Sequence, residues 1–296
     1  MKRVIISTII LITFIFPVTS MEISTLFHIS DMSFDNTSTA PVSSFSGTNY
    51  PWGLSVFGSD DISDEMTLKA GVFYDPILRY TTYTLFEYQH EFFKLGVGPF
   101  FGVFNTPGTI LKSGISTAVR VEIPGILFAS LKADSSIGSR FVKVGDYLQE
   151  SNEISMGYYI PNAICSVSLK SKSFVTKQAA DLEVDDSFTE YAFNVDMFQK
   201  NVSFTAMLSF AYQTISRSYL TVSTSASTEN TLNSLILGTN FKFKIADGFT
   251  LITNLESNVY SFGYLDTTAL TLPGSGPGIF LFRITTGVSL DLDVFK

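Results

Sequence analysis

The sequence predicts an all-β fold: a closed antiparallel transmembrane β-barrel of about 14 strands, with about 12 to 16 allowed by its weaker segments. The first observation is composition, since 45% of the 296 residues are hydrophobic and 16% are charged, against about 25% charged in a typical soluble domain. The second is the alternation of apolar and polar side chains, which is the period of a β-strand. The third is that short and long connections take alternate places along the chain. This combination is typical of a barrel in a membrane.

The first 20 residues have the features of a secretory leader. Lys2 and Arg3 precede an uncharged stretch from Val4 to Phe16, and a cleavage site follows Ser20. This stretch is too short for a spanning helix, which needs about 20 apolar residues. We therefore expect a signal peptide over residues 1–20 and a transmembrane barrel over residues 21–296.

Composition also excludes several classes of protein. No later stretch holds 18 consecutive apolar residues, so no spanning helix is expected. The single cysteine, Cys165, excludes a lipidated N-terminus, a disulfide framework and a cysteine-based zinc site. Without Lys2 and Arg3 the chain has 17 basic and 27 acidic residues, a net charge of −10, which disfavours nucleic acid as a partner. We expect no cofactor and no metal, since His28 and His90 lie far apart and no phosphate-binding loop occurs.

The alternation is clearest from Ile110 to Ile123. There Val119 and Val121 share one face, Arg120 and Glu122 the other, and Pro124-Gly125 then predicts a tight turn. The same analysis along the chain predicts strands over residues 22–34, 52–59, 65–75, 80–90, 92–104, 110–123, 127–134, 153–160, 165–172, 190–197, 202–213, 234–245, 249–259 and 280–294.

The connections between these strands form two groups. The short ones are 60–64, 90–91, 124–125, 161–163, 198–201 and 246–248. The long ones, rich in Ser, Thr, Gly, Pro or Asp, are 35–51, 135–152, 175–186, 214–230 and 261–278. Only the connections 75–79 and 105–108 depart from this alternation, because they are short at positions where a long loop is expected. Short turns at one end, with both termini beside them, and long loops at the other favour a closed barrel.

A soluble sandwich remains an alternative, because a soluble antiparallel sheet also has one apolar and one polar face. An even strand number permits closure without edges, as lipid requires. Full charges such as Arg120, Lys132 and Lys242 lie in the middle of strands. Both features favour a barrel with a wet lumen.

The last residues resemble the assembly signal of bacterial outer-membrane proteins. The matching positions are Thr285, Gly287, Leu290, Leu292 and Phe295. Phe295 is penultimate here, because Lys296 follows it. The resemblance implies insertion by the bacterial barrel-assembly machinery into outer-membrane lipid. It also implies periplasmic termini and extracellular long loops.

In strand number, length and lack of a separate plug segment, the chain resembles the monomeric fourteen-stranded porins. Fourteen strands lie nearer to a water channel than to a barrel filled by side chains. The resemblance implies a monomer without enzymatic activity, through which small hydrophilic solutes or ions diffuse passively. Any occlusion of the lumen must come from loops.

The strand register predicts which charged side chains line the pore. The basic candidates are Lys69, Lys94, Lys112, Arg120, Lys132, Lys170, Lys172, Lys242, Lys244 and Arg283. The acidic candidates are Glu87, Glu122, Asp134, Glu190, Asp196, Glu256, Asp291 and Asp293. Since both signs are mixed, we expect weak selectivity. Asp181, Glu183, Asp185 and Asp186 are expected in one long loop, either attracting cations at the mouth or simply solvated.

Three other functions remain open. A lipid hydrolase would use His28 and Ser30, whose spacing on the first strand weakly resembles that of outer-membrane phospholipases, although we expect His28 to face the lumen. A surface adhesin or structural barrel would use the Ser/Thr-rich segment 214–230. A fatty-acid-type transporter would need a hydrophobic path, which the expected lumen polarity disfavours.

Overall fold

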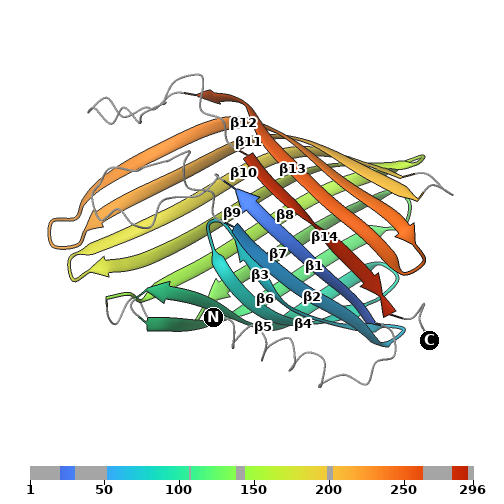
Figure 1. Ribbon diagram of the computed structural model, residues 1–296, viewed down its shortest axis with the longest axis horizontal. Coiled ribbons are helices and arrows are strands. Elements are labelled where there is room, and N and C mark those ends of the chain that lie inside the picture. The colour runs from blue at the N-terminus through green and yellow to red at the C-terminus, as the bar shows by residue number, and fades with distance from the viewer. Residues whose placement is uncertain are drawn as a thin grey trace.

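The computed structural model describes residues 21–30, 52–106, 108–137, 144–198, 203–262 and 282–292, and it shows a closed antiparallel barrel (Figure 1). Each strand pairs with its neighbours in the sequence, and the first pairs with the fourteenth. The predicted fold class and strand number are confirmed. The strands are β1 (Met21–Ser30), β2 (Trp52–Ser63), β3 (Met66–Asp75), β4 (Arg79–Gln89), β5 (Phe93–Thr106), β6 (Gly108–Ile123), β7 (Leu127–Ser136), β8 (Tyr147–Ile160), β9 (Ala163–Ala179), β10 (Leu182–Phe198), β11 (Phe204–Thr221), β12 (Ala226–Ala246), β13 (Phe249–Phe262) and β14 (Phe282–Asp291).

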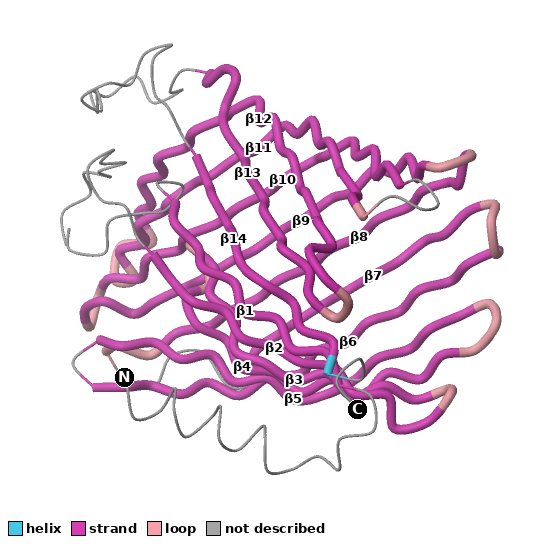
Figure 2. Tube along the Cα trace, turned by 45° about the vertical axis from the view of Figure 1, so that its right-hand side comes forward, coloured by secondary structure: helices cyan, strands magenta, loops and turns pink. Residues whose placement is uncertain are grey.

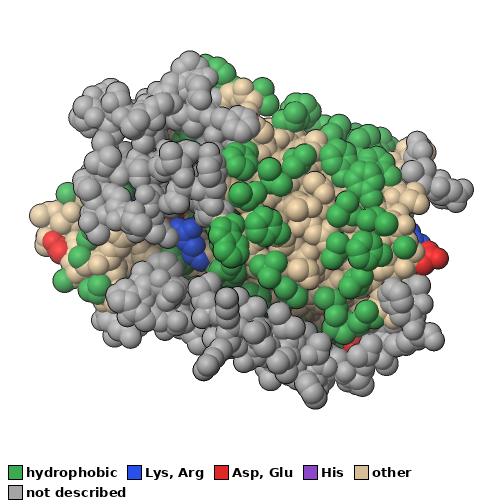
Figure 3. Space-filling model, in the orientation of Figure 1, with side chains coloured by type: hydrophobic (Ala, Val, Ile, Leu, Met, Phe, Trp, Pro, Cys, Tyr) green, Lys and Arg blue, Asp and Glu red, His purple; other side chains and the backbone are tan. Residues whose placement is uncertain are grey.

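The outer face of the barrel is apolar, as expected for a barrel whose outer surface faces lipid. Large side chains remain exposed there, including Phe210 (62%) and Val259 (67%). Figure 3 shows hydrophobic side chains over much of the outer face that it presents. On β12 the outward residues run from Leu235 to Ile245. At about 3.3 Å per residue and a tilt of about 40°, this band is about 25 Å tall, which matches the hydrocarbon layer. Side chains on the opposite face of each strand point into the lumen.

The seam between β1 and β14 closes the barrel. The two strands pair from Glu22 with Asp291 to Ser30 with Arg283. On the inner face Ser24 Oγ donates a hydrogen bond of 2.9 Å to Ser289 Oγ. The termini of the described barrel therefore complete the sheet and leave no free edge in lipid.

Tight turns join the strands at the end of the barrel where β1 begins and β14 ends, which we call the turn end. Pro124-Gly125 lies between β6 and β7, with Gly125 at a φ of 72°. Asp247-Gly248 joins β12 to β13, with Gly248 also at a φ of 72°. Because a side chain disfavours this backbone conformation, glycine suits both turns. The expected short connections at this end are confirmed wherever the structure describes them.

At the opposite end, the loop end, two predictions are wrong. Segments 175–186 and 214–230, expected to be long loops, belong mostly to β9 to β12, with tight turns at 180–181 and 222–225. These strands form two tall hairpins (Figure 2). The tips are joined, because Asp181 Oδ1 accepts the Ser223 amide at 2.5 Å. Above the apolar band the outward face of a strand meets water instead of lipid, so its sequence loses the apolar and polar alternation that predicts strands.

Several other strands differ from their expected bounds. The strand expected at 153–160 starts at Tyr147, and that expected at 52–59 continues to Ser63. The first strand ends at Ser30, and the rest of its expected range lies outside the described residues. Residues 1–20, the expected leader, also lie outside them. Among the described residues no helix is long and apolar enough to cross a membrane.

Candidate functional site

The short connection between β3 and β4 folds into the lumen. Ile77 and Leu78 at its tip are only 3% and 8% exposed. They pack with inward side chains of β8 to β12 at the loop end, in the cluster Tyr147, Phe174, Phe188, Ala192, Ala211, Ile215, Leu232 and Ile236. A connection at the top of the short strands β3 and β4 thus reaches the opposite, taller wall. The expected lumen polarity does not hold here, since this part of the inner wall is apolar.

Asp75 holds this connection in two ways. Its Oδ1 accepts the amides of Ile77 at 2.8 Å and Leu78 at 3.1 Å, which fixes a tight turn. Its Oδ2 forms an ion pair with Nζ of Lys172 on β9, across the lumen. At the other side of the turn, Arg79 Nη1 donates to the Pro76 carbonyl at 2.7 Å. We call residues 75–79 the lumen turn.

Two side chains of β8 cross from the other side of the lumen. Gln149 Nε2 donates to Thr81 Oγ1 on β4 at 2.6 Å. The Tyr147 hydroxyl accepts the Lys112 amide of β6 at 3.2 Å. Gly102 leaves the space for them, because a Cβ at this position would lie 2.8 Å from the Tyr147 hydroxyl. With the lumen turn, these contacts narrow the barrel at the level where the apolar cluster lies.

Most of the predicted pore-lining charges lie on the inner face and neutralise one another. The ion pairs are Lys112 with Asp146 (3.0 Å), Arg120 with Glu122 (2.8 Å), Lys170 with Glu190 (3.4 Å), and Arg283 with Glu256. Lys244 pairs with Asp247 of the turn at 2.7 Å. Lys132 and Lys242 remain exposed, and Asp134 accepts the Ser116 hydroxyl at 2.5 Å. Asp196 is on the inner face of β10, Asp291 ends β14 at the turn end, and Asp293 lies outside the described residues.

A group of lysines surrounds Glu87 on the inner wall of β3 to β7. Glu87 Oε2 lies 2.8 Å from Lys69 Nζ and 2.9 Å from Lys94 Nζ. Beside them a cavity of about 180 Å³ is lined by Lys69, Tyr83, Leu85, Glu87, Ser116, Ala118 and Lys132. Lys132 Nζ lies 5.5 Å from the centre of the Tyr83 ring. The register therefore brings together three of the predicted pore-lining lysines, Lys69, Lys94 and Lys132, while Tyr83 was not predicted.

The acidic residues expected in a loop lie on β10 or at its tip. Asp186 faces inward and forms a buried two-bond ion pair with Arg217 of β11, at 2.6 and 2.7 Å. Asp185 accepts the Ser173 hydroxyl at 3.0 Å, and Glu183 is buried. The expected acidic loop is thus largely part of the barrel wall.

His28 faces the lumen, as its register predicts. Its Nε2 lies 2.7 Å from Ser55 Oγ and its Nδ1 lies 3.0 Å from Thr285 Oγ1. Ser30, the expected partner for hydrolysis, instead donates to the Phe282 carbonyl at 3.2 Å. Ser55 has no exposed surface, so a substrate carbonyl has no path to its oxygen. The geometry places His28 as a link between β1, β2 and β14.

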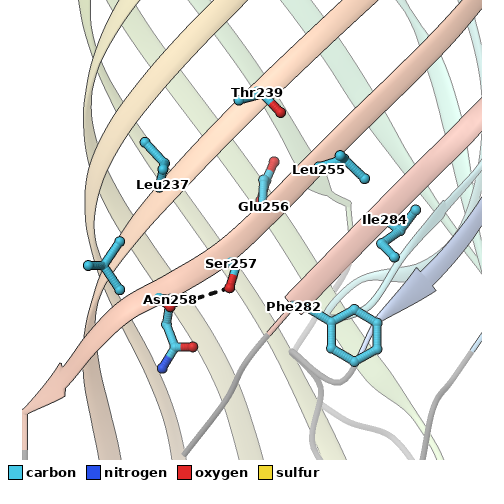
Figure 4. Close-up of a pocket in the computed structure, with 9 residues that line it drawn as sticks. Leu237, Thr239, Leu255, Glu256, Ser257, Asn258, Phe282 and Ile284 are labelled. Atoms are coloured by element: carbon cyan, nitrogen blue, oxygen red, sulfur yellow. Dashed lines mark hydrogen bonds between the residues drawn. The ribbon is translucent and has the colours of Figure 1, made fainter.

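A shallow depression on the outside of the barrel lies between β12, β13 and β14 (Figure 4). Leu237, Leu255, Phe282 and Ile284 line it, and Ser257 Oγ donates to the Asn258 carbonyl at 3.3 Å. Glu256 belongs to the inner face, where it pairs with Arg283. The depression is part of the apolar outer band, although Thr239, Ser257 and Asn258 also line it.

The C-terminal signal residues take part in closure. Thr285 contacts His28, and Gly287 pairs with Leu26. Leu290 pairs with Ile23 across the same seam, and Phe295 lies outside the described residues. Within the part of the chain that the structure describes, no group of three or more His, Cys, Asp or Glu side chains is placed to hold a metal ion.

The lumen turn was not predicted. The connection 75–79 was noted only as an exception in length. A signal was present, because Ile77 and Leu78 are two adjacent apolar residues where a solvated loop is expected.

Comparisons with known proteins concern the architecture alone. No protein-family model matches the chain, and no curated protein matches its sequence. Among solved structures, OmpT, an outer membrane protein of Vibrio cholerae, is similar over 91% of this chain and 98% of that chain, with 9% identity and a TM-score of 0.37. The anion-selective porin from Comamonas acidovorans is similar over 92% of this chain and 98% of that chain, with 12% identity and a TM-score of 0.38. The CymD monoaromatic hydrocarbon channel is similar over 92% of this chain and 88% of that chain, with 9% identity and a TM-score of 0.38. Because these TM-scores are all below 0.5, the barrel fold rests on the strand pairing of this chain itself.

Proposed function

We propose that this chain is an outer-membrane channel for passive diffusion of small solutes, and that the lumen turn sets the width of its passage. The observation that carries the proposal is the inner wall at the turn end. Lys132 and Lys242 are solvent-exposed on the lumen side there, inside an apolar outer band. A lysine at the bilayer midplane on the lipid side costs about 2–4 kcal/mol. A water-filled lumen supplies the solvation that these side chains need.

The proposal includes an orientation. Short turns and both ends of the described barrel lie together, which in outer-membrane barrels is the periplasmic side. The tall hairpins of β9 to β12 would then be extracellular. We further propose that the chain is a monomer in outer-membrane lipid, inserted by the barrel-assembly machinery through its C-terminal residues.

Hydrophilic solutes or ions fit the turn-end half of the lumen. Because most inner charges are paired, as with Lys170 and Glu190, neither sign dominates strongly. Weak selectivity is therefore the expected property of the open passage.

Transport of apolar solutes is a second candidate. On the inner wall of the loop-end half, Phe174, Phe188 and Ile215 pack in one buried cluster with the lumen turn. If the turn moved away, these side chains would form an apolar entry. Uptake of an apolar dye into vesicles without ion current would favour this function over a hydrophilic channel.

The test is ion current through the refolded chain in a planar bilayer. In a Cys165→Ala background, Lys242→Cys places one thiol on the inner face of β12, and Leu237→Cys places one on its outer face. A bulky hydrophilic thiol reagent should reduce the current of Lys242→Cys and leave that of Leu237→Cys unchanged. Absence of current, or an equal response of both variants, would refute the channel.

A further inference from the structure

We propose that the cavity between Lys69, Tyr83 and Lys132 binds a small organic anion, a carboxylate that carries an aromatic or other apolar group. The site deepens the proposed function, because it names a solute class for the lumen. Binding of the anion does not require that the barrel conducts ions, so the anion site and the channel can be tested independently.

The cavity is built into the barrel wall. Its residues come from β3, β4, β6 and β7, and their placement is fixed by strand register. A volume of about 180 Å³ corresponds to about six water molecules at about 30 Å³ each. That space suits a small organic molecule. Since Lys132 is exposed, the cavity can be reached from the lumen.

The charges around the cavity favour an anion. Lys69 and Lys94 share the single carboxylate of Glu87. Lys132 forms no ion pair with any residue that the structure describes, and Asp134 accepts the Ser116 hydroxyl. Among the residues that line the cavity, Lys69 and Lys132 face the single carboxylate of Glu87, which leaves one positive charge. Lys132 is the group best able to take a ligand carboxylate.

The remaining walls favour an apolar group on that anion. Leu85 is buried although it belongs to the inner face. The Tyr83 ring stacks on Phe73, with centroids 4.7 Å apart, so its orientation is fixed. A hydrated inorganic ion would gain nothing from these surfaces, whereas an aromatic ring would bury area against both.

The experiment measures binding to the full chain in detergent micelles by isothermal titration, with benzoate as the probe. Benzyl alcohol tests the ring without the charge, and phosphate tests the charge without the ring. Lys132→Gln should weaken benzoate binding about tenfold, the effect of one charge-assisted hydrogen bond. Lys242→Gln removes the same charge on β12, outside the cavity, and should change binding less than about twofold.

Glu87→Gln should change benzoate affinity in the opposite direction. It frees Lys69 and Lys94 from their shared carboxylate, so benzoate should bind more tightly. A variant that merely misfolds would not bind more tightly, and circular dichroism checks the fold of each. Equal effects of Lys132→Gln and Lys242→Gln, equal binding of benzoate and benzyl alcohol, or phosphate binding as tight as benzoate would each overturn the site. Loss of conductance with benzoate binding intact would overturn the channel and leave the site standing.

Discussion

Asp75 of β3 and Lys172 of β9 form an ion pair across the lumen, between strands that are not neighbours in the sheet. The pair tethers the lumen turn to the opposite wall, and Ile77 and Leu78 add apolar contacts with that wall. Neither interaction belongs to the hydrogen-bonded ladder that closes the barrel. The lumen turn can therefore separate from the opposite wall without breaking the hydrogen bonds of the sheet.

Removing this tether should widen the passage. Lys172→Gln leaves the Asp75 turn bonds to Ile77 and Leu78 in place but ends the ion pair. A hydrogen bond to a charged group contributes about 1.5–3 kcal/mol, so the undocked turn becomes more populated. Single-channel recording should show larger or more frequent openings. Lys244→Gln, which removes an exposed pair with Asp247, is the control and should conduct like the parent chain. Identical currents in the two variants would contradict the role of the tether.

The docked turn should protect its tip from reagents. In a Cys165→Ala background, Leu78→Cys should react slowly with a hydrophilic thiol reagent, because Leu78 is buried against the far wall. Adding Lys172→Gln should speed the reaction. Lys132→Cys reports an exposed lumen position and should react quickly in both backgrounds. If the thiol at Leu78 reacts as fast as that at Lys132 without the second change, the turn is not docked.

The sequence predicted the barrel because lipid and water impose opposite demands on the two faces of each strand. Val119 and Arg120 show this on β6, where one faces the hydrocarbon side and the other the lumen. Above the apolar band this contrast ends. The residues near Asp185 and Ser218 meet water outside the barrel, so their polarity suggested loops although they form β10 and β11.

The charged lumen residues were also predictable, because period two assigns each side chain to a face. Their partners were not. Lys172 contacts Asp75 only because closure brings β9 opposite β3, and a single sequence carries no measure of that distance. The same holds for Tyr83 and Lys132, which meet through the curvature of the wall between β4 and β7.

The buried pair of Asp186 and Arg217 should hold the tall hairpins together. Their side chains are 6% and 2% exposed, and loss of one partner of a buried pair typically costs about 3–5 kcal/mol because the other charge is left uncompensated. Asp186→Asn should therefore speed hydrogen exchange in the loop-end halves of β10 and β11. The double variant Asp186→Leu with Arg217→Met leaves no lone charge and should exchange more slowly than the single variant. Exchange in Asp186→Asn at the parent rate would show that the pair contributes little.

Gly287 should be essential to the seam that closes the barrel. It pairs with Leu26, and a Cβ there would overlap the Thr25 carbonyl oxygen and lie 2.8 Å from the Leu26 Cα. Backbone cannot turn aside as a side chain can, so Gly287→Ala should cost about 1–3 kcal/mol and lower the fraction of chain that refolds into micelles. Gly238→Ala is the matched control on β12, because its Cβ would meet the Ser209 Cβ at 3.2 Å and the Glu256 side chain at 3.5 Å. These contacts are with side-chain atoms, and only small shifts are needed. Equal urea midpoints for the two variants would mean that the seam tolerates a side chain at this position, and that Gly287 serves assembly in some way other than close strand approach.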